Sequence, residues 1–120
     1  MDPIVLSADK VSPAARDQVA AFHRSTVEEV DRAVQRDRVV VVGMAQNPFV
    51  KKARQLLESE GVKFTYLEYG SYLSGWKVRL ALKLWARFPT FPMVFVDGTL
   101  VGGHAELGRL RDDGGLKALR

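Results

Sequence analysis

The feature that most constrains the fold is a run of four valines, Val39–Val42, between Arg38 and Gly43. β-Branched side chains favour strands, and an unbroken apolar run is typical of a strand that is covered on both faces. Such a strand needs further secondary structure packed on each side of it. The run therefore predicts a central strand inside a layered α/β domain.

The segments after this strand alternate between helix and strand patterns. Asn47-Pro48 is a helix start signal, and the apolar residues that follow share one side until Gly61 ends the helix. Residues 62–69 have strand character. A further helix is expected over Gly75–Ala86, with Ser74 as its N-cap.

A hairpin is predicted near the C-terminus, because the short strands Met93–Val96 and Thr99–Val101 flank the turn dipeptide Asp97-Gly98. A closing helix with a break at Gly114-Gly115 follows it. The order is β-α-β-α-β-β-α. It predicts a four-stranded mixed sheet flanked by helices, because a crossover helix links parallel strands whereas a hairpin is antiparallel.

The first third of the chain is helical in character, as one kinked helix or two. Ser12-Pro13 is a cap and first-turn pair, and Ser25 with Glu28 fits the capping box. Apolar residues recur at helical spacing. The stripe consists of Val19, Phe22, Thr26, Val30 and Val34.

A chain of 120 residues is long enough for one hydrophobic core. We expect residues 1–24 to form an N-terminal helical extension and residues 25–120 to form the domain. The net charge is +4, but basic and acidic residues are interspersed, so we expect no nucleic-acid partner. No apolar run approaches the roughly 20 residues of a membrane span, and the expected location is cytoplasmic.

Three motifs in the second half of the chain are spaced as in one known family. Val78–Lys83 is similar to I-R-x-x-L-K, Phe88–Pro92 to the following W-P-T-[IVF]-P, and Gly102-Gly103 to x-G-G before the last helix. The chain thus resembles the glutaredoxins of the thioredoxin-like superfamily, closest to the single-cysteine (monothiol) branch. The resemblance spans about residues 25–119 and implies a thioredoxin-like fold.

The chain departs from this family at the reactive position. Asn47, Pro48, Phe49 and Val50 stand where the family has C-G-F-S or C-P-Y-C, and the whole chain contains no cysteine. Disulfide exchange needs an attacking thiolate, and an iron–sulfur cluster of the family type needs a cysteine ligand. This chain can supply neither the attacking thiolate nor the cysteine ligand. Asn47 is a good N-cap residue, and its amide is also a candidate donor to a ligand sulfur or carbonyl.

The resemblance implies a glutathione site built mostly from groups other than the cysteine. Thr90-Phe91-Pro92 matches the family's T-x-P turn, in which the proline is cis and the residue before it pairs its main chain with the ligand. Arg79 matches a position that often holds one carboxylate of glutathione. The free N–H groups near His104 and Ala105 are expected to hold the γ-glutamyl carboxylate.

Two family contacts are altered. Ala105 stands where the family commonly has aspartate, with Glu106 as a candidate replacement, and an upstream lysine is replaced by Met44 or lost. Weaker or changed binding is the expected consequence. The candidate ligand-binding residues are Asn47, Phe49, Arg79, Thr90, Phe91, Pro92, Gly102, Gly103, His104 and Ala105.

The leading hypothesis is a cysteine-less glutaredoxin-like protein, a non-catalytic module that binds glutathione, an extended peptide or a partner protein. One alternative is a glutathione-transferase-like enzyme in which Asn47 stabilises the thiolate of bound glutathione. The other is a structural partner subunit, with an interface at Trp76 and Trp85 or at the N-terminal helix, and a homodimer is one such assembly. His23 and His104 have no cysteine beside them, and no metal site is expected.

Overall fold

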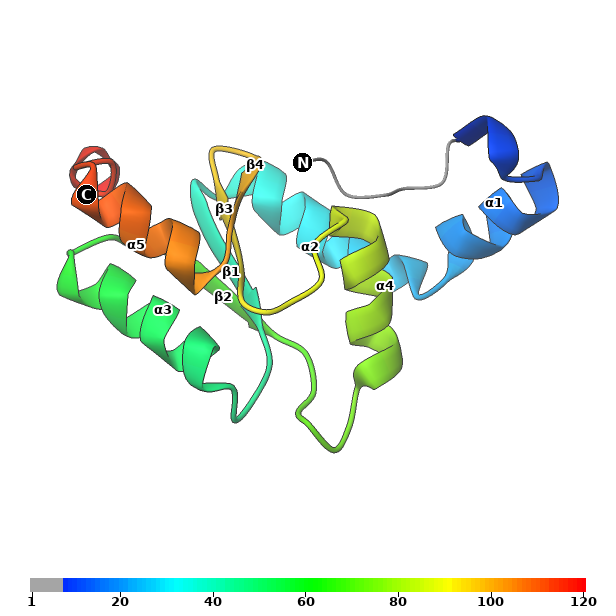
Figure 1. Cartoon of the computed structure of the whole chain (residues 1–120), viewed down its shortest axis with the longest axis horizontal. Helices are drawn as coiled ribbons and strands as arrows, with labels where there is room; N and C mark the ends of the chain where they lie inside the picture. The colour runs from blue at the N-terminus through cyan, green and yellow to red at the C-terminus, as the bar shows by residue number, and fades with distance from the viewer. Residues whose placement is uncertain (1–7) are drawn as a thin grey trace.

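The computed structural model describes residues 8–120, apart from the side chains of residues 8, 19 and 20. Helices and strands follow one another in the predicted order (Figure 1). Their bounds are η1 Ala8–Lys10, α1 Pro13–Ala21, α2 Arg24–Arg36, β1 Val39–Gly43, α3 Pro48–Ser59, β2 Thr65–Glu68, α4 Trp76–Ala86, β3 Met93–Val96, β4 Thr99–Gly102, α5 His104–Asp112 and η2 Lys117–Leu119.

The four strands form one mixed sheet in the order β2-β1-β3-β4. β1 runs parallel to β2 and antiparallel to β3, and Val41 lies between Tyr66 and Val94 in the register. The hairpin pairs β3 with β4 through Asp97 and Gly98, whose φ angles are 49° and 82°. Positive φ at both positions is what a type I′ hairpin turn requires. The prediction of an α/β fold with a four-stranded mixed sheet is confirmed.

The valine run occupies the centre of the molecule. Val40 and Val42 belong to a core cluster shared with α2 and α4. Val39 and Val41 belong to a second cluster, shared with α3 and α5. Figure 1 shows these two helix pairs on opposite sides of the sheet. All four side chains are at most 2% exposed, so each contributes about 1.5 kcal/mol or more of burial free energy.

The N-terminal region consists of two helices rather than one kinked helix. The break falls at His23, whose φ of 47° is left-handed, and α2 begins at Arg24. The predicted capping box of Ser25 and Glu28 is therefore wrong, because Ser25 already lies within the helix. Glu28 instead pairs with Arg24 at 2.7 Å, one turn away. The stripe continues through Val30 and Val34 into the core.

The first of these helices has the predicted start. The N–H of Ala15 donates to Oγ of Ser12 at 3.2 Å, so Ser12 caps α1. Figure 1 shows α1 extending beyond α2, away from the sheet. The Val19 side chain, predicted on the apolar stripe, lies outside the described residues.

Two predicted boundaries are wrong for local reasons. β2 spans Thr65–Glu68 instead of 62–69, because the Val62 N–H donates to the Leu57 carbonyl and belongs to the end of α3. α4 begins at Trp76, after Gly75, which has a left-handed φ of 75° and gives no side-chain cap. Ser74 is not the N-cap that its residue type predicts.

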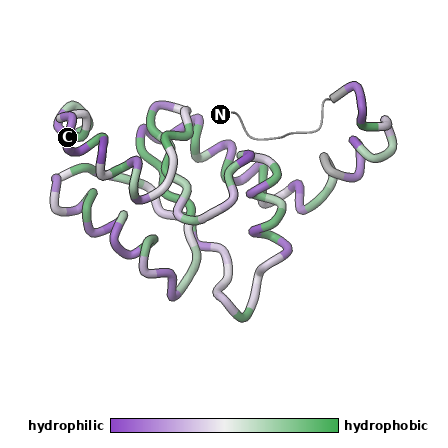
Figure 2. Tube along the Cα trace, viewed as in Figure 1, coloured by the Kyte–Doolittle hydropathy of each residue, from purple (hydrophilic) through white to green (hydrophobic). Residues whose placement is uncertain are grey.

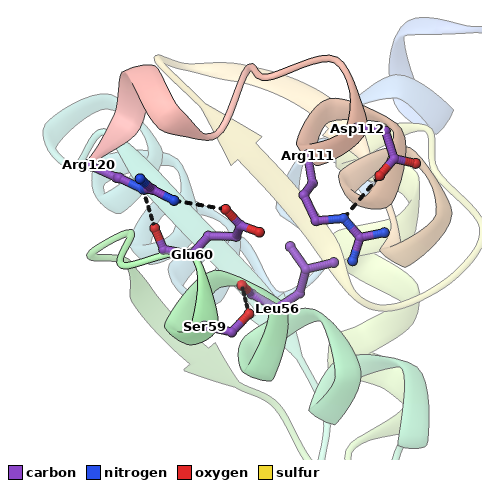
Figure 3. Close-up of polar contacts among 6 residues, drawn as sticks. All are labelled: Leu56, Ser59, Glu60, Arg111, Asp112 and Arg120. Carbon is purple, nitrogen blue, oxygen red and sulfur yellow. Dashed lines mark hydrogen bonds and ion pairs between the residues drawn. The ribbon is translucent and has the colours of Figure 1, made fainter.

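The C-terminus is fastened to the end of α3 (Figure 3). Arg120 donates from Nε to the Glu60 carbonyl at 2.6 Å and from Nη2 to the Glu60 carboxylate at 3.1 Å. The predicted break at Gly114-Gly115 is present, and after it Leu116 is 1% exposed in the core. Among residues 8–120, no helix is long and apolar enough to cross a membrane.

Candidate functional site

An open groove of about 620 Å³ lies where α3 and α5 begin, beside α4 and the turn between α4 and β3. We call it the main groove. The ends of two helices and a loop meet there because the sheet brings them to one edge of the molecule. Its lining residues are Met44, Asn47, Phe49, Tyr72, Arg79, Lys83, Phe88, Pro89, Thr90, Phe91, Pro92, Gly103, His104, Ala105 and Glu106.

All candidate residues from the sequence except Gly102 line this groove. Gly102 does not line the groove. Its φ is 127°, and a Cβ there would lie 2.5 Å from Oε1 of Glu106. Its role is therefore to let the chain pass close to Glu106. The proximity of the other residues is a property of the fold, whereas their contact with a ligand stays a prediction.

Asn47 begins α3 as its N-cap, as predicted. Oδ1 accepts hydrogen bonds from the N–H groups of Phe49 at 2.9 Å and Val50 at 3.1 Å, and Pro48 occupies the first helical position. The cap uses only the oxygen of the amide. Nδ2 of Asn47 has no hydrogen-bond partner within the described part of the chain, so it is free to donate to a ligand.

The turn before β3 lines part of the groove. The Phe91–Pro92 peptide bond is cis, as the T-x-P resemblance predicts. Phe91 is 6% exposed, and its ring packs in the core cluster below α4. Nζ of Lys83 lies 5.9 Å from the centre of that ring. The buried ring leaves the main chain of this turn, together with the exposed Thr90, for contact with a ligand.

The start of α5 carries both donors and an acidic group. The N–H groups of His104 and Ala105 have no acceptor among residues 8–120, as is usual for the first turn of a helix. Glu106 turns back toward the same end, and its Oε1 accepts from the Gly103 N–H at 3.0 Å. The ring centres of His104 and Phe49 lie 6.3 Å apart and link the starts of α5 and α3.

Arg79 is a buried arginine that holds a loop. The residue is 8% exposed, and Nη1 donates to the carbonyls of Ser74 at 2.6 Å and Tyr69 at 3.2 Å. Gly70 and Gly75 pack against the same nitrogen, where a Cβ would lie 2.6 Å and 3.3 Å away. The guanidinium thereby fastens residues 69–75, the loop that brings Tyr72 to the groove.

A second groove, of about 450 Å³, shares Met44 and Asn47 with the main groove. Within it the Arg54 guanidinium lies 3.9 Å from the centre of the Tyr66 ring, and the Tyr66 hydroxyl donates to Glu68 at 2.9 Å. Burial, assisted by the Glu68 carboxylate, raises the pKa of Tyr66 to about 12. The phenol therefore stays protonated to a higher pH than an ordinary tyrosine, and it keeps its hydrogen bond to Glu68.

The chemistry open to these grooves is limited by their side chains. There is no cysteine, so neither groove holds a thiolate of the protein's own. Between residues 8 and 120, no group of three or more His, Cys, Asp or Glu side chains is arranged to hold a metal ion. Hydrogen bonds, apolar contact and charge pairing are the interactions that the lining offers.

Sequence reasoning did not assign Lys83, Tyr72, Phe88 or Pro89 to the site. Lys83, Phe88 and Pro89 fall inside the two motifs that carry the family resemblance, so the motif spacing contained the signal for them. Tyr72 had no local signal. Its place depends on the conformation of the 69–75 loop, which Arg79 holds through the carbonyls of Tyr69 and Ser74.

Comparisons with known proteins find similar sequences and similar folds. A family model described as Glutaredoxin matches residues 39–101. A glutaredoxin-like protein of Dictyostelium discoideum is 54% identical over 82 residues, which cover 68% of this chain and 67% of that protein. Wheat glutaredoxin has a similar crystal structure, with a TM-score of 0.69 and 27% identity over 80% of this chain and 92% of that one. A buckwheat glutaredoxin–glutathione complex has a TM-score of 0.70 at 20% identity, covering 86% and 90% of the two chains.

Proposed function

This chain belongs to the glutaredoxin family, and we propose that it is a non-catalytic member that binds glutathione, or a peptide of similar chemistry, in the main groove. One observation carries the proposal. A single groove is bordered by the Phe91–Pro92 turn, by the Lys83 ammonium and by the first N–H groups of α5, which have no acceptor among residues 8–120. These groups are present although the reactive thiol is missing. The glutathione complex of the buckwheat protein is consistent with it.

The ligand is proposed to lie along the Phe91–Pro92 turn. Its main chain pairs with that of Phe91 as in a short antiparallel ladder. A carboxylate at one end accepts hydrogen bonds from the N–H groups of His104 and Ala105. A carboxylate at the other end pairs with Lys83. Arg79 contributes mainly by fixing the 69–75 loop, because its Nη1 is already bonded to two carbonyls.

Binding in this arrangement is non-covalent. Asn47 caps α3 at the position where the family has its attacking cysteine, and an amide does not exchange with disulfides. A ligand thiol that reaches Asn47 would accept a hydrogen bond from Nδ2 and would stay intact. The proposal places the protein in a compartment such as the cytoplasm, where glutathione is kept reduced.

An NMR titration of the full chain with reduced glutathione tests the proposal. We expect shifts at Phe91 and at Gly103–Ala105, and a several-fold weaker affinity for Lys83→Gln. The matched control is Lys117→Gln, which removes an exposed charge on η2, away from the groove residues. The absence of shifts at millimolar glutathione would exclude glutathione as the ligand. A peptide with the same carboxylate spacing would then be titrated.

A second function, glutathione transfer, is favoured only by the free Nδ2 of Asn47, which is positioned to stabilise a ligand thiolate. The test is the rate of conjugation of reduced glutathione to a general electrophile. Wild type and Asn47→Ala are compared after the free energy of unfolding of each has been measured, since Ala also removes the helix cap. Equal rates would exclude a role for Asn47 in such a reaction.

A further inference from the structure

The outer side of α4 carries a line of exposed apolar side chains. Trp76, Leu80 and Leu84 are 61%, 40% and 50% exposed, whereas Ala81 and Leu82 on the same helix are buried. Residues four apart lie above one another on a helix, so the three form one ridge, which we call the α4 stripe. Leu73, 93% exposed, lies in the loop before the helix, and Figure 2 shows hydrophobic colouring at the tip of that loop.

The segment that contains this stripe has basic residues but no acidic ones. No aspartate or glutamate occurs between Tyr69 and Val96, a stretch that contains Lys77, Arg79, Lys83 and Arg87. Arg79 is turned inward to the loop carbonyls, and Lys83 lines the main groove. The exposed Lys77 and Arg87 remain, near the two ends of the stripe, and Nζ of Lys77 lies 5.6 Å from the Trp76 ring.

This charge pattern decides between kinds of partner. A second copy packed through the same helix would bring the cations Lys77 and Arg87 of the two copies together, with no acidic residue on α4 to compensate. A protein binds a membrane surface through many cations or a broad apolar face, whereas the α4 stripe offers two outward cations and a narrow ridge. An apolar ridge between two cations matches a helix that has apolar residues at the same spacing and acidic residues beside them.

We propose that the α4 stripe is a docking surface for an acidic amphipathic helix of a partner protein. The partner's apolar side chains pack between Trp76, Leu80 and Leu84, and its carboxylates pair with Lys77 and Arg87. The charged pairs select the partner and set its direction, while the apolar contacts supply most of the affinity. The surface is separate from the contacts proposed for glutathione, so its occupancy does not depend on a ligand in the main groove.

The test uses the intrinsic fluorescence of Trp76. The chain has two tryptophans, and Trp85→Phe leaves Trp76 as the reporter while it keeps an aromatic ring beside Phe95. The probe is a synthetic helical peptide with leucines four residues apart and flanking glutamates. Its control has lysine in place of each glutamate. We expect a saturable blue shift with the glutamate peptide and about tenfold weaker binding of the lysine peptide.

Variants of exposed residues then locate the surface. Leu80→Ser with Leu84→Ser should abolish the shift, and Lys77→Glu with Arg87→Glu should reverse the preference between the two peptides. The matched control, Arg109→Glu with Lys117→Glu, makes the same charge change on α5 and η2 and should leave both affinities unchanged. Circular dichroism confirms that each variant is folded.

Several results would overturn the proposal. No shift with the glutamate peptide, or equal affinity for the two peptides, would remove the acidic helix as the partner. A larger shift with vesicles that contain phosphatidylserine than with the peptide would assign the stripe to a membrane surface. A concentration-dependent increase in mass by light scattering that Leu80→Ser with Leu84→Ser abolishes would assign it to a second copy of this chain.

Discussion

Oε1 of Glu106 accepts a hydrogen bond from the N–H of Gly103 at 3.0 Å, at the end of α5 where the family resemblance places a ligand carboxylate. The contact satisfies one donor at the start of α5, whereas the N–H groups of His104 and Ala105 have no acceptor within the part of the chain that the structure describes. It also puts a negative charge beside these donors. The same end of α5 therefore offers hydrogen bonds to an anion and repels its charge.

Neutralising this charge should strengthen the binding of an anionic ligand. Glu106→Gln keeps an oxygen that can accept from Gly103 N–H, so the cap is retained while the repulsion is removed. We expect reduced glutathione to bind about threefold more tightly, since a charge near a helix terminus contributes about 0.3 to 1 kcal/mol. Isothermal calorimetry measures the change. A weaker affinity would mean that Glu106 receives the ligand's amino group instead.

Restoring a thiol at position 47 should give the groove covalent chemistry. In Asn47→Cys the thiolate would attack oxidised glutathione, form a mixed disulfide and release one reduced glutathione. The matched control is Ser12→Cys, because Ser12 is also an N-cap and lies outside the groove. Mass spectrometry over time should show at least about tenfold faster glutathionylation at position 47, owing to binding beside the thiol. Equal rates at the two positions would contradict binding in the groove.

Removing the Arg79 guanidinium should destabilise the fold. Arg79→Met keeps the apolar stem but removes the guanidinium donor of both carbonyls, so that Tyr69 loses its hydrogen bond and Ser74 keeps only the one from the Ser71 N–H. We expect a loss of about 2 to 3 kcal/mol in the free energy of unfolding, measured by urea denaturation. The exposed Arg109→Met is the control, with a change of about 0.5 kcal/mol or less. A similar small change for Arg79→Met would show that the loop holds without this contact.

Two partly buried tyrosines should make stability fall at alkaline pH. The hydroxyl of Tyr69 donates to Glu29, and burial with this contact raises its pKa above the ordinary 10.0. Burial raises the pKa of Tyr66 to about 12. A raised folded-state pKa means stabilisation that is complete below pH 10 and is lost as the pH rises through 10 toward 12.

Urea denaturation across that range of pH measures the decline in the free energy of unfolding. Because lysines also titrate there, the contribution of the tyrosines is isolated by comparing wild type with a variant that lacks both hydroxyls. Tyr66→Phe with Tyr69→Phe should be less stable than wild type at pH 8 and should lose less of its stability between pH 10 and 12. Tyr72→Phe, at an exposed position, is the control. Parallel curves for the double variant and wild type would contradict the assignment.

Local signals in the sequence succeeded where a residue's neighbours in the chain decide its conformation. The Asp97-Gly98 turn, the Asn47 cap and the Ser12 cap are of this kind. They failed where the backbone conformation of a neighbouring residue moves the helix start. Ser74 has the residue type of a cap, but its carbonyl is bound by Arg79 and the left-handed Gly75 takes the cap position. Ser25 and Glu28 have the capping-box spacing, but the chain breaks earlier, at His23.

The sequence by itself determined the order of strands and helices along the chain, the buried centre at Val39–Val42 and the absence of a thiol, because each depends on residue type and local spacing. Only the tertiary structure decided that Arg79 is buried against a loop, that Glu106 faces the donors of α5 and that Trp76 stays exposed. These features depend on which surfaces the packed helices cover, and no short pattern encodes that.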